Sequence, residues 1–186
     1  MVSLRKQVFK LTTLAVLVIM LISMGVIDNQ YVKRLQVSER EALRLHVYAL
    51  LSVATLEDGH LSVPTILSNP AFNTENSSLW AAVFDSEHEV LWQSLSSPGV
   101  FDGLELASTA GIWSVGDQKI NGDDYLTTAF KIVWNEGQRI EFQIVVAEKS
   151  TVLEGDIREF RITLLTGYVV ITLSLLLLQL FVLRLA

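Results

Sequence analysis

Two long runs of apolar residues frame the sequence. Leu11–Ile27 contains no charged residue, and in Ile162–Leu183 the only strongly polar side chain is Gln179. About 20 apolar residues cross the hydrocarbon core of a bilayer as a helix, and the first run reaches that length when extended back to Val8. The pattern predicts two transmembrane helices, at 11–27 and 162–183, on either side of a more polar segment.

Helical periodicity continues past the first apolar run. Neither Gly nor Pro occurs from Val26 to Asp58, and apolar residues recur at spacings of three, four and seven. These residues are Leu35, Leu43, Val47, Leu50, Leu51 and Ala54. We predict an amphipathic helix over Asn29–Thr55 that grows out of the first span and ends before the Asp58-Gly59 turn. Ser38 and Glu41 match a capping box, which leaves open a break near Ser38.

The periodicity then changes from helical to extended. Leu61–Asn76 contains two prolines and three asparagines, and is expected to be a loop with one short turn of helix. Five later segments have the composition or alternation of strands. They are 79–84, 90–95, 112–120, 125–134 and 139–148. Asn121-Gly122 is a strong hairpin signal between the third and the fourth, and from Thr151 a second helix is expected to run into the second span.

These elements predict an α+β fold with a central antiparallel sheet of about five strands and a long N-terminal helix that covers it. All 20 acidic residues lie between Asp28 and Glu159, whereas Arg5, Lys6 and Lys10 precede the first span and Arg184 follows the second. The positive-inside rule then places both termini in the cytoplasm. The expected organisation is a cytoplasmic N-terminus at 1–10, a span at 11–27, an external domain at 28–161, a span at 162–183 and a cytoplasmic end at 184–186.

The acidic external segment fits a periplasmic domain anchored in a bacterial inner membrane. A second interpretation of the first apolar run is a cleaved signal peptide, because Ser23-Met24-Gly25 resembles a small-x-small cleavage site. The run is long for the apolar part of a signal peptide, and the sequence that follows it continues as a helix. We therefore favour a retained span.

Composition and motifs exclude several classes of function. The formal net charge of −6 disfavours nucleic-acid binding, which needs a basic surface. The chain has no cysteine, so disulfides and cysteine metal sites are absent. The sequence contains neither a GxSxG motif nor a phosphate-binding glycine loop after a strand. We expect no catalytic residues and no resident cofactor, and an envelope hydrolase is disfavoured.

Two groups of acidic residues are candidate binding sites. Asp123 and Asp124, with Asp117 nearby, carry the oxygen ligands that Mg²⁺ and Ca²⁺ prefer; the alternative is a solvated hairpin turn. The second group is an acidic patch of Asp85, Glu87 and Glu89, which an ordinary polar turn also explains. His88 lies within that patch and is a candidate for sensing mild acid.

Polar residues inside the predicted second span are candidates for helix–helix contacts. Gln179, Thr166 and Ser174 are such residues, and polar side chains in membranes often face other helices. We expect them to act as a polar relay in a dimeric bundle. The alternative for Gln179 is that its amide reaches the membrane interface from the cytoplasmic end of the span.

Three stretches, in this order, resemble PhoQ-type sensor histidine kinases, which carry a periplasmic PAS-like domain of the PDC type between two spans. They are Ala54–Leu61, then Ala82–Asp85 with Leu91-Trp92, then Ile144–Glu148 leading into the second span. This resemblance covers most of 47–185.

The resemblance implies a homodimeric sensor that passes an external signal to a cytoplasmic kinase domain, and through it to a response regulator. The 186 residues include no phospho-acceptor or ATP-binding domain, so this chain is not expected to be an enzyme itself. The long acidic run of the best-known members is reduced here to Asp123-Asp124, which puts divalent-cation sensing in doubt. The alternative function is a standalone membrane-anchored interaction protein that binds an envelope partner.

Overall fold

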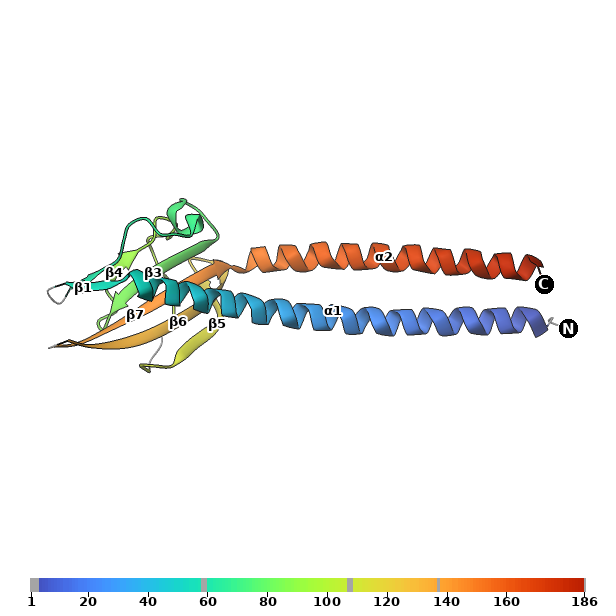
Figure 1. The fold of residues 1–186 in the computed structure, drawn as a ribbon, viewed down its shortest axis with the longest axis horizontal. Coiled ribbons are helices and arrows are strands. Elements are labelled where there is room, and N and C mark those ends of the chain that lie inside the picture. The colour runs from blue at the N-terminus through green and yellow to red at the C-terminus, as the bar shows by residue number, and fades with distance from the viewer. Residues whose placement is uncertain (1–3, 58–59, 107–108, 137, 186) are drawn as a thin grey trace. The chain divides into compact units, whose positions relative to one another are not determined.

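The computed structural model describes residues 4–57, 60–106, 109–136 and 138–185. The chain forms two compact units. One consists of Met1–Leu35 together with Glu154–Ala186, and the other is Gln36–Leu153. The first unit is a pair of antiparallel helical segments, and the second is a domain built on a β-sheet (Figure 1).

Two long helices begin and end the fold. Helix α1 covers Leu4–Val53 and helix α2 covers Ser150–Leu185. Between them the described residues form seven strands and a short 3₁₀ helix, η1. Their bounds are β1 Thr55–Glu57, β2 His60–Ser62, η1 Pro70–Asn73, β3 Leu79–Asp85, β4 Val90–Gln93, β5 Trp113–Ile120, β6 Asp123–Glu136 and β7 Gln138–Lys149.

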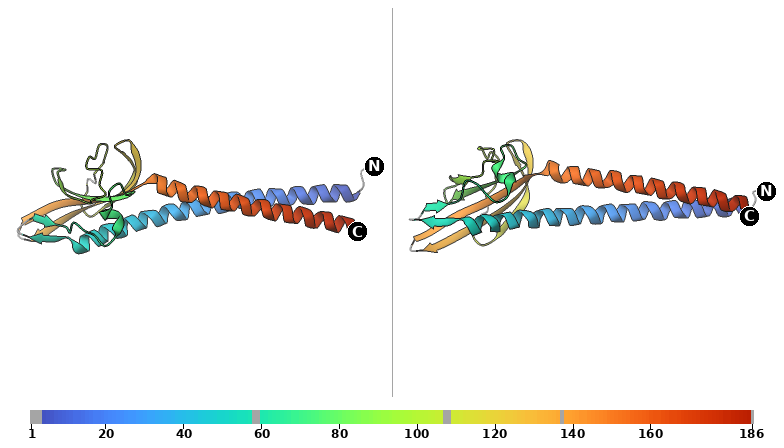
Figure 2. Two further views of the ribbon diagram at one scale, coloured as in Figure 1. Left: turned by 90° about the horizontal axis from the view of Figure 1, so that it is seen from above. Right: turned by 45° about the horizontal axis from the view of Figure 1, so that its top comes forward.

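Five of the strands form one antiparallel sheet in the order β4-β3-β7-β6-β5. The longest pairing joins β6 to β7, from Tyr125 opposite Lys149 to Glu136 opposite Gln138 (Figure 2). Strand β3 pairs with both β4 and β7, and its first six residues are buried, as expected for a strand covered on both faces. The α+β class and the five-stranded antiparallel sheet predicted from the sequence are confirmed.

The last turns of α1 cover one face of this sheet. Leu43, Val47 and Leu50, three and four residues apart, are almost completely buried against the sheet. The sheet contributes alternate residues to this core, as the period of two in a strand requires. They include Leu79, Ala81 and Val83 from β3, Leu126 from β6, and Phe142, Ile144 and Val146 from β7.

The opposite face of the sheet has a second apolar core. Its buried members are Trp80, Ala82, Phe84, Ile120, Tyr125, Ala129, Val145 and Ala147. The segment between β4 and β5 packs against them through Phe101, Leu104 and Leu106. The sequence predicts a solvated or half-covered face here, and the structure shows a loop-covered one.

Helix α1 differs from its prediction at two points. It runs through Ser38 without a break, and it ends at Val53 rather than at Thr55. The Ala54 N–H still donates to the Leu50 carbonyl at 3.0 Å, and the β-branched Thr55 then turns into an extended strand opposite Ser62. The resulting β1–β2 pair was not predicted, and Asp58-Gly59 lies outside the described residues.

Both long helices contain stretches that are long and apolar enough to cross a membrane. In α1 the exposed large side chains of this stretch include Leu11, Leu14, Leu21 and Ile22. In α2 they include Leu173, Leu177 and Leu178. Exposure of so many adjacent apolar side chains is unusual for a helix in water and is typical of one in lipid.

The packing of α1 on the sheet predicts unequal effects for two neighbouring leucines. Leu43→Ala removes a fully buried side chain and is expected to lower the free energy of unfolding by about 2–5 kcal/mol. Leu45→Ala, on the same helix but 65% exposed, is expected to change it by no more than about 0.5 kcal/mol.

Denaturant titration of the full chain in detergent, followed by tryptophan fluorescence, measures this difference. All four tryptophans lie in the strands of the sheet, at positions 80, 92, 113 and 134, so the signal reports unfolding of the domain. Equal midpoints for the two variants would show that α1 does not pack on the sheet through Leu43.

Candidate functional site

The best candidate for a ligand site in the sheet domain is an open groove of about 460 Å³ on the loop-covered face of the sheet. It lies against the end of β3 and the start of β4, under the segment that connects β4 to β5. Five of the seven lining side chains are apolar and two are titratable. The lining residues are Phe84, His88, Val90, Phe101, Asp102, Leu104 and Leu106.

The wall of the groove is attached to the sheet by the side chain of Asn121. Its Nδ2 donates to the carbonyl of Val100 at 2.6 Å, and its Oδ1 accepts from the N–H of Asp102 at 3.1 Å. The N–H of Asn121 in turn donates to the carbonyl of Asp102 at 3.0 Å. One residue at the β5–β6 turn therefore makes three hydrogen bonds to the loop, on both sides of Phe101.

Gln118, on edge strand β5, holds the next part of the same loop. Its Oε1 accepts from the N–H of Glu105 at 2.9 Å, and its Nε2 donates to the carbonyl of Glu105 at 3.1 Å. Between the two attachment points Gly103 has a φ of 87°, and a Cβ there would collide with the carbonyl oxygen of Lys119. Only glycine fits at this close approach.

Aromatic packing and a buried amide lie on the same face of the sheet as the groove. Phe101 packs on Trp80 and on Phe84, with ring centroids 5.2 Å apart in both pairs. Gln143 lies directly opposite Phe84 in the β3–β7 register, and its buried Nε2 has no hydrogen-bond partner among the described residues. A buried donor without a partner is costly.

The predicted acidic patch forms the turn beside this groove. The Oδ1 of Asp85 accepts from the N–H groups of Glu87 and Glu89, both at 2.8 Å, so this carboxylate builds the turn rather than pointing at a ligand. His88 has a φ of 70° at the tight part of the turn, and its exposed side chain lines the groove. The structure thus brings His88 to a site, although its role as a pH sensor stays a prediction.

The predicted cation ligands Asp117, Asp123 and Asp124 are exposed on β5 and β6. Asp123 Oδ2 is 2.7 Å from the Nζ of Lys149, and this hydrogen bond raises the pKa of Lys149 above its ordinary value. Within the described residues no three acidic or histidine side chains gather as a metal site. A cation at Asp123 would have to compete with Lys149, so cation binding at this turn stays a prediction.

One of the three polar residues predicted to mediate contacts in the second span faces the other helix. The Oε1 of Gln179 accepts from the hydroxyl of Thr13 at 2.9 Å, and the hydroxyls of Ser23 and Tyr168 lie 2.7 Å apart. Thr166 and Ser174 instead donate to carbonyls of their own helix, at Ile162 and Val170, and are exposed. The interhelical contacts thus include Gln179 and one pair, Ser23–Tyr168, that we did not predict.

A further contact between the helices, also missed, joins the two apolar segments at one end. The Nε and an Nη of Arg161 donate to the two carboxylate oxygens of Asp28, at 2.8 and 3.0 Å. The hydrogen bond from Arg161 lowers the pKa of Asp28. Next to this pair the rings of Tyr31 and Phe160 stack at 3.6 Å. One sequence signal was available, because Asp28 directly follows the first apolar run and Arg161 directly precedes the second.

The geometry defines an α+β domain, with a loop-walled groove on its sheet, inserted between two helices that are long enough to span a membrane. No protein-family model matches the sequence, and no curated protein matches it.

Gln118 provides a direct test of how the groove wall is held. Gln118→Ala removes two hydrogen bonds to the backbone of Glu105 and is expected to destabilise the local structure of the loop by about 1–2 kcal/mol. Hydrogen exchange measured by mass spectrometry should then be faster at residues 100–106. Ser114→Ala, at an exposed position of the same strand, is the matched control. Unchanged exchange in the Gln118 variant would contradict the assigned role.

Proposed function

We propose that this chain is the membrane-anchored input module of a two-component histidine kinase. In this proposal the sheet domain is PAS-like, of the PDC type, and faces the periplasm of a bacterial cell. The apolar parts of α1 and α2 cross the inner membrane, and both chain termini are cytoplasmic. A signal received by the domain reaches a kinase domain through the two helices.

One observation carries the proposal: each long helix joins its apolar segment to the sheet domain without a linker. Helix α1 contains the whole first apolar run and also Leu43, Val47 and Leu50 of the domain core. Strand β7 ends at Lys149 and α2 begins at Ser150, so a central strand continues directly into the second helix. A protein that only tethers a domain does not need this continuity, because a flexible linker serves equally well.

The sheet supports the PAS-like assignment. Its first and last strands, β3 and β7, lie side by side in the middle, and the other strands extend outward from them in antiparallel hairpins. A five-stranded antiparallel sheet of this kind, preceded by a long helix on one face, resembles the PAS-like domains of sensor kinases. The motif Ala82–Asp85 lies on β3 and Ile144–Glu148 on β7, the two adjacent central strands.

The groove on the far face of the sheet supplies an entry point for a signal. A ligand bound against Phe84 and Phe101 would contact β3 and the attached loop, while α1 packs on the opposite face of the same strands. Ligand binding shifts a protein only if it favours one conformation over another. We propose that binding here changes the packing of α1, in a homodimer whose spans then move by a small rotation or translation.

The second candidate is a standalone membrane protein that binds an envelope partner and transmits no signal. The observation that favours it is the exposed apolar edge of the sheet at β4. There Val90 and Leu91 are 42% and 45% exposed, and Leu95, just beyond the strand, is 50% exposed. Unpaired edge strands bind other chains through backbone hydrogen bonds.

A hybrid protein distinguishes between the two proposed functions. Residues 1–186 are joined to the cytoplasmic part of a histidine kinase that drives a reporter gene, and the core is perturbed by Leu43→Ala. If the helices relay conformation, this substitution changes the reporter output. Gly-Gly inserted between Gln36 and Val37 interrupts α1 and is expected to abolish the change, because glycine disfavours helix.

The matched control is a seven-residue alanine-rich insertion at the same point. Seven residues are close to two helical turns, so the helix stays continuous and its faces stay aligned to within about 20°. This variant is expected to keep the response to Leu43→Ala. The relay would be rejected, and the standalone protein favoured, by either of two results. The first is a reporter output that Leu43→Ala does not change, and the second is a response to Leu43→Ala that both insertions alter equally.

A further inference from the structure

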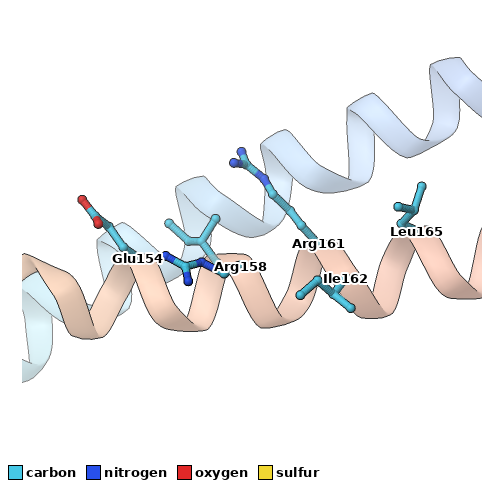
Figure 3. A pocket seen from close by; sticks show the side chains of 6 residues that line it. Glu154, Arg158, Arg161, Ile162 and Leu165 are labelled. Atoms are coloured by element: carbon cyan, nitrogen blue, oxygen red, sulfur yellow. The ribbon is translucent and has the colours of Figure 1, made fainter.

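A second groove, of about 440 Å³, follows the surface of α2 where its apolar segment begins (Figure 3). All of its lining residues come from α2. They are Glu154, Ile157, Arg158, Arg161, Ile162 and Leu165. The groove therefore belongs to the helical unit and does not involve the sheet domain.

Charged and apolar side chains follow one another along this groove in a fixed order. Glu154 comes first, Arg158 one turn later, and Ile162 and Leu165 after that, as Figure 3 shows. With a rise of 1.5 Å per residue, Glu154 and Arg158 are separated by about 6 Å along the helix axis, and so are Arg158 and Ile162. A negative group, a positive group and an apolar surface thus succeed each other toward the apolar end.

The two charges at the polar end are available to a ligand. Within the part of the chain that the structure describes, Glu154 and Arg158 have no ion-pair partner, whereas Arg161 is held by both carboxylate oxygens of Asp28. Both side chains are exposed. The groove therefore presents one free carboxylate and one free guanidinium.

We infer that this groove binds a zwitterionic phospholipid whose headgroup carries a primary amine, as in phosphatidylethanolamine. The order of groups in this lipid, from the water toward the bilayer, is ammonium, phosphate and acyl chain. That order matches Glu154, Arg158 and the surface of Ile162 and Leu165. Arg158 forms charge-assisted hydrogen bonds with the phosphate, and Glu154 accepts from the ammonium group.

The same geometry predicts which lipids are disfavoured. Phosphatidylcholine has methyl groups in place of the N–H donors, so Glu154 loses its hydrogen bond. Phosphatidylglycerol has a neutral glycerol in place of the ammonium group, so the carboxylate of Glu154 has no opposite charge beside it. A single charge-assisted hydrogen bond gained or lost corresponds to roughly a tenfold change in affinity. We therefore expect about tenfold preference for the amine-bearing lipid.

Native mass spectrometry of the full chain in mild detergent tests the inference. The delipidated protein is titrated with phosphatidylethanolamine, phosphatidylcholine and phosphatidylglycerol of identical acyl chains. The wild type is expected to bind the first about tenfold more tightly than either other lipid. Glu154→Gln is expected to abolish that preference, because the three lipids share the phosphate and differ in the group that faces this carboxylate. Glu159→Gln, an exposed carboxylate of the same helix outside the groove, is the control and should keep it.

An exchange of the two charges provides the sharpest comparison. Glu154→Arg combined with Arg158→Glu keeps the net charge and the composition but reverses the order of the groups, so the preference should disappear. A preference that survives this exchange, or a wild type that binds the three lipids equally, would overturn the inference.

The inference depends on the proposal that the apolar segments lie in a membrane. Different results would contradict the inference and the proposal. If the full chain stays in cell membranes during alkaline extraction but shows no lipid preference, only the lipid site is wrong. If alkaline extraction releases the chain from membranes, the proposed membrane anchoring itself is wrong.

Discussion

The uninterrupted backbone hydrogen bonding of α1 is the constraint on which the rest of the structure depends. Its first apolar run contains no charged side chain, and an unsatisfied backbone group in apolar surroundings costs several kcal/mol. No residue interrupts the helix at the end of this run, so it continues to Val53. Along the way its pattern changes from apolar on all sides to one buried stripe at Leu43, Val47 and Leu50, and the domain core begins on the same helix.

Helix α2 is connected to the sheet domain through a strand, whereas α1 itself contributes residues to the domain core. Strand β7 lies between β3 and β6 and is buried from Phe142 to Ala147, and α2 follows it directly. The pairs Thr13–Gln179 and Asp28–Arg161 tie α2 to α1 at widely separated levels of the helical unit. A hydrogen bond between polar side chains contributes about 0.6 kcal/mol in a membrane. Such contacts therefore determine how the helices align more than how stable the pair is.

Local patterns predict much of this fold, and contacts between distant residues account for what they miss. The alternation of apolar and polar residues and the Asn121-Gly122 turn signal locate the five strands, because both depend only on residues close together in the sequence. The same local patterns predict that Asn121 is a turn residue. They do not predict its hydrogen bonds to Val100 and Asp102, because these depend on the path of the loop. It proposes Asp123 as a cation ligand, whereas the β6–β7 register brings Lys149 beside it. The groove itself arises from packing across the sheet, which no short motif encodes.

The most direct test of the central claim is a cysteine scan of α1 in native membranes. The chain has no cysteine of its own, so each variant from residue 11 to 53 carries a single reactive thiol. With a membrane-impermeant maleimide, the account predicts no labelling at 11–27 and labelling from 36 to 53 with one unbroken period of 3.6 residues, lowest at 43, 47 and 50. Labelling throughout 11–27, or an interruption of the 3.6-residue labelling period near Ser38, would contradict a single helix that joins the membrane to the domain core.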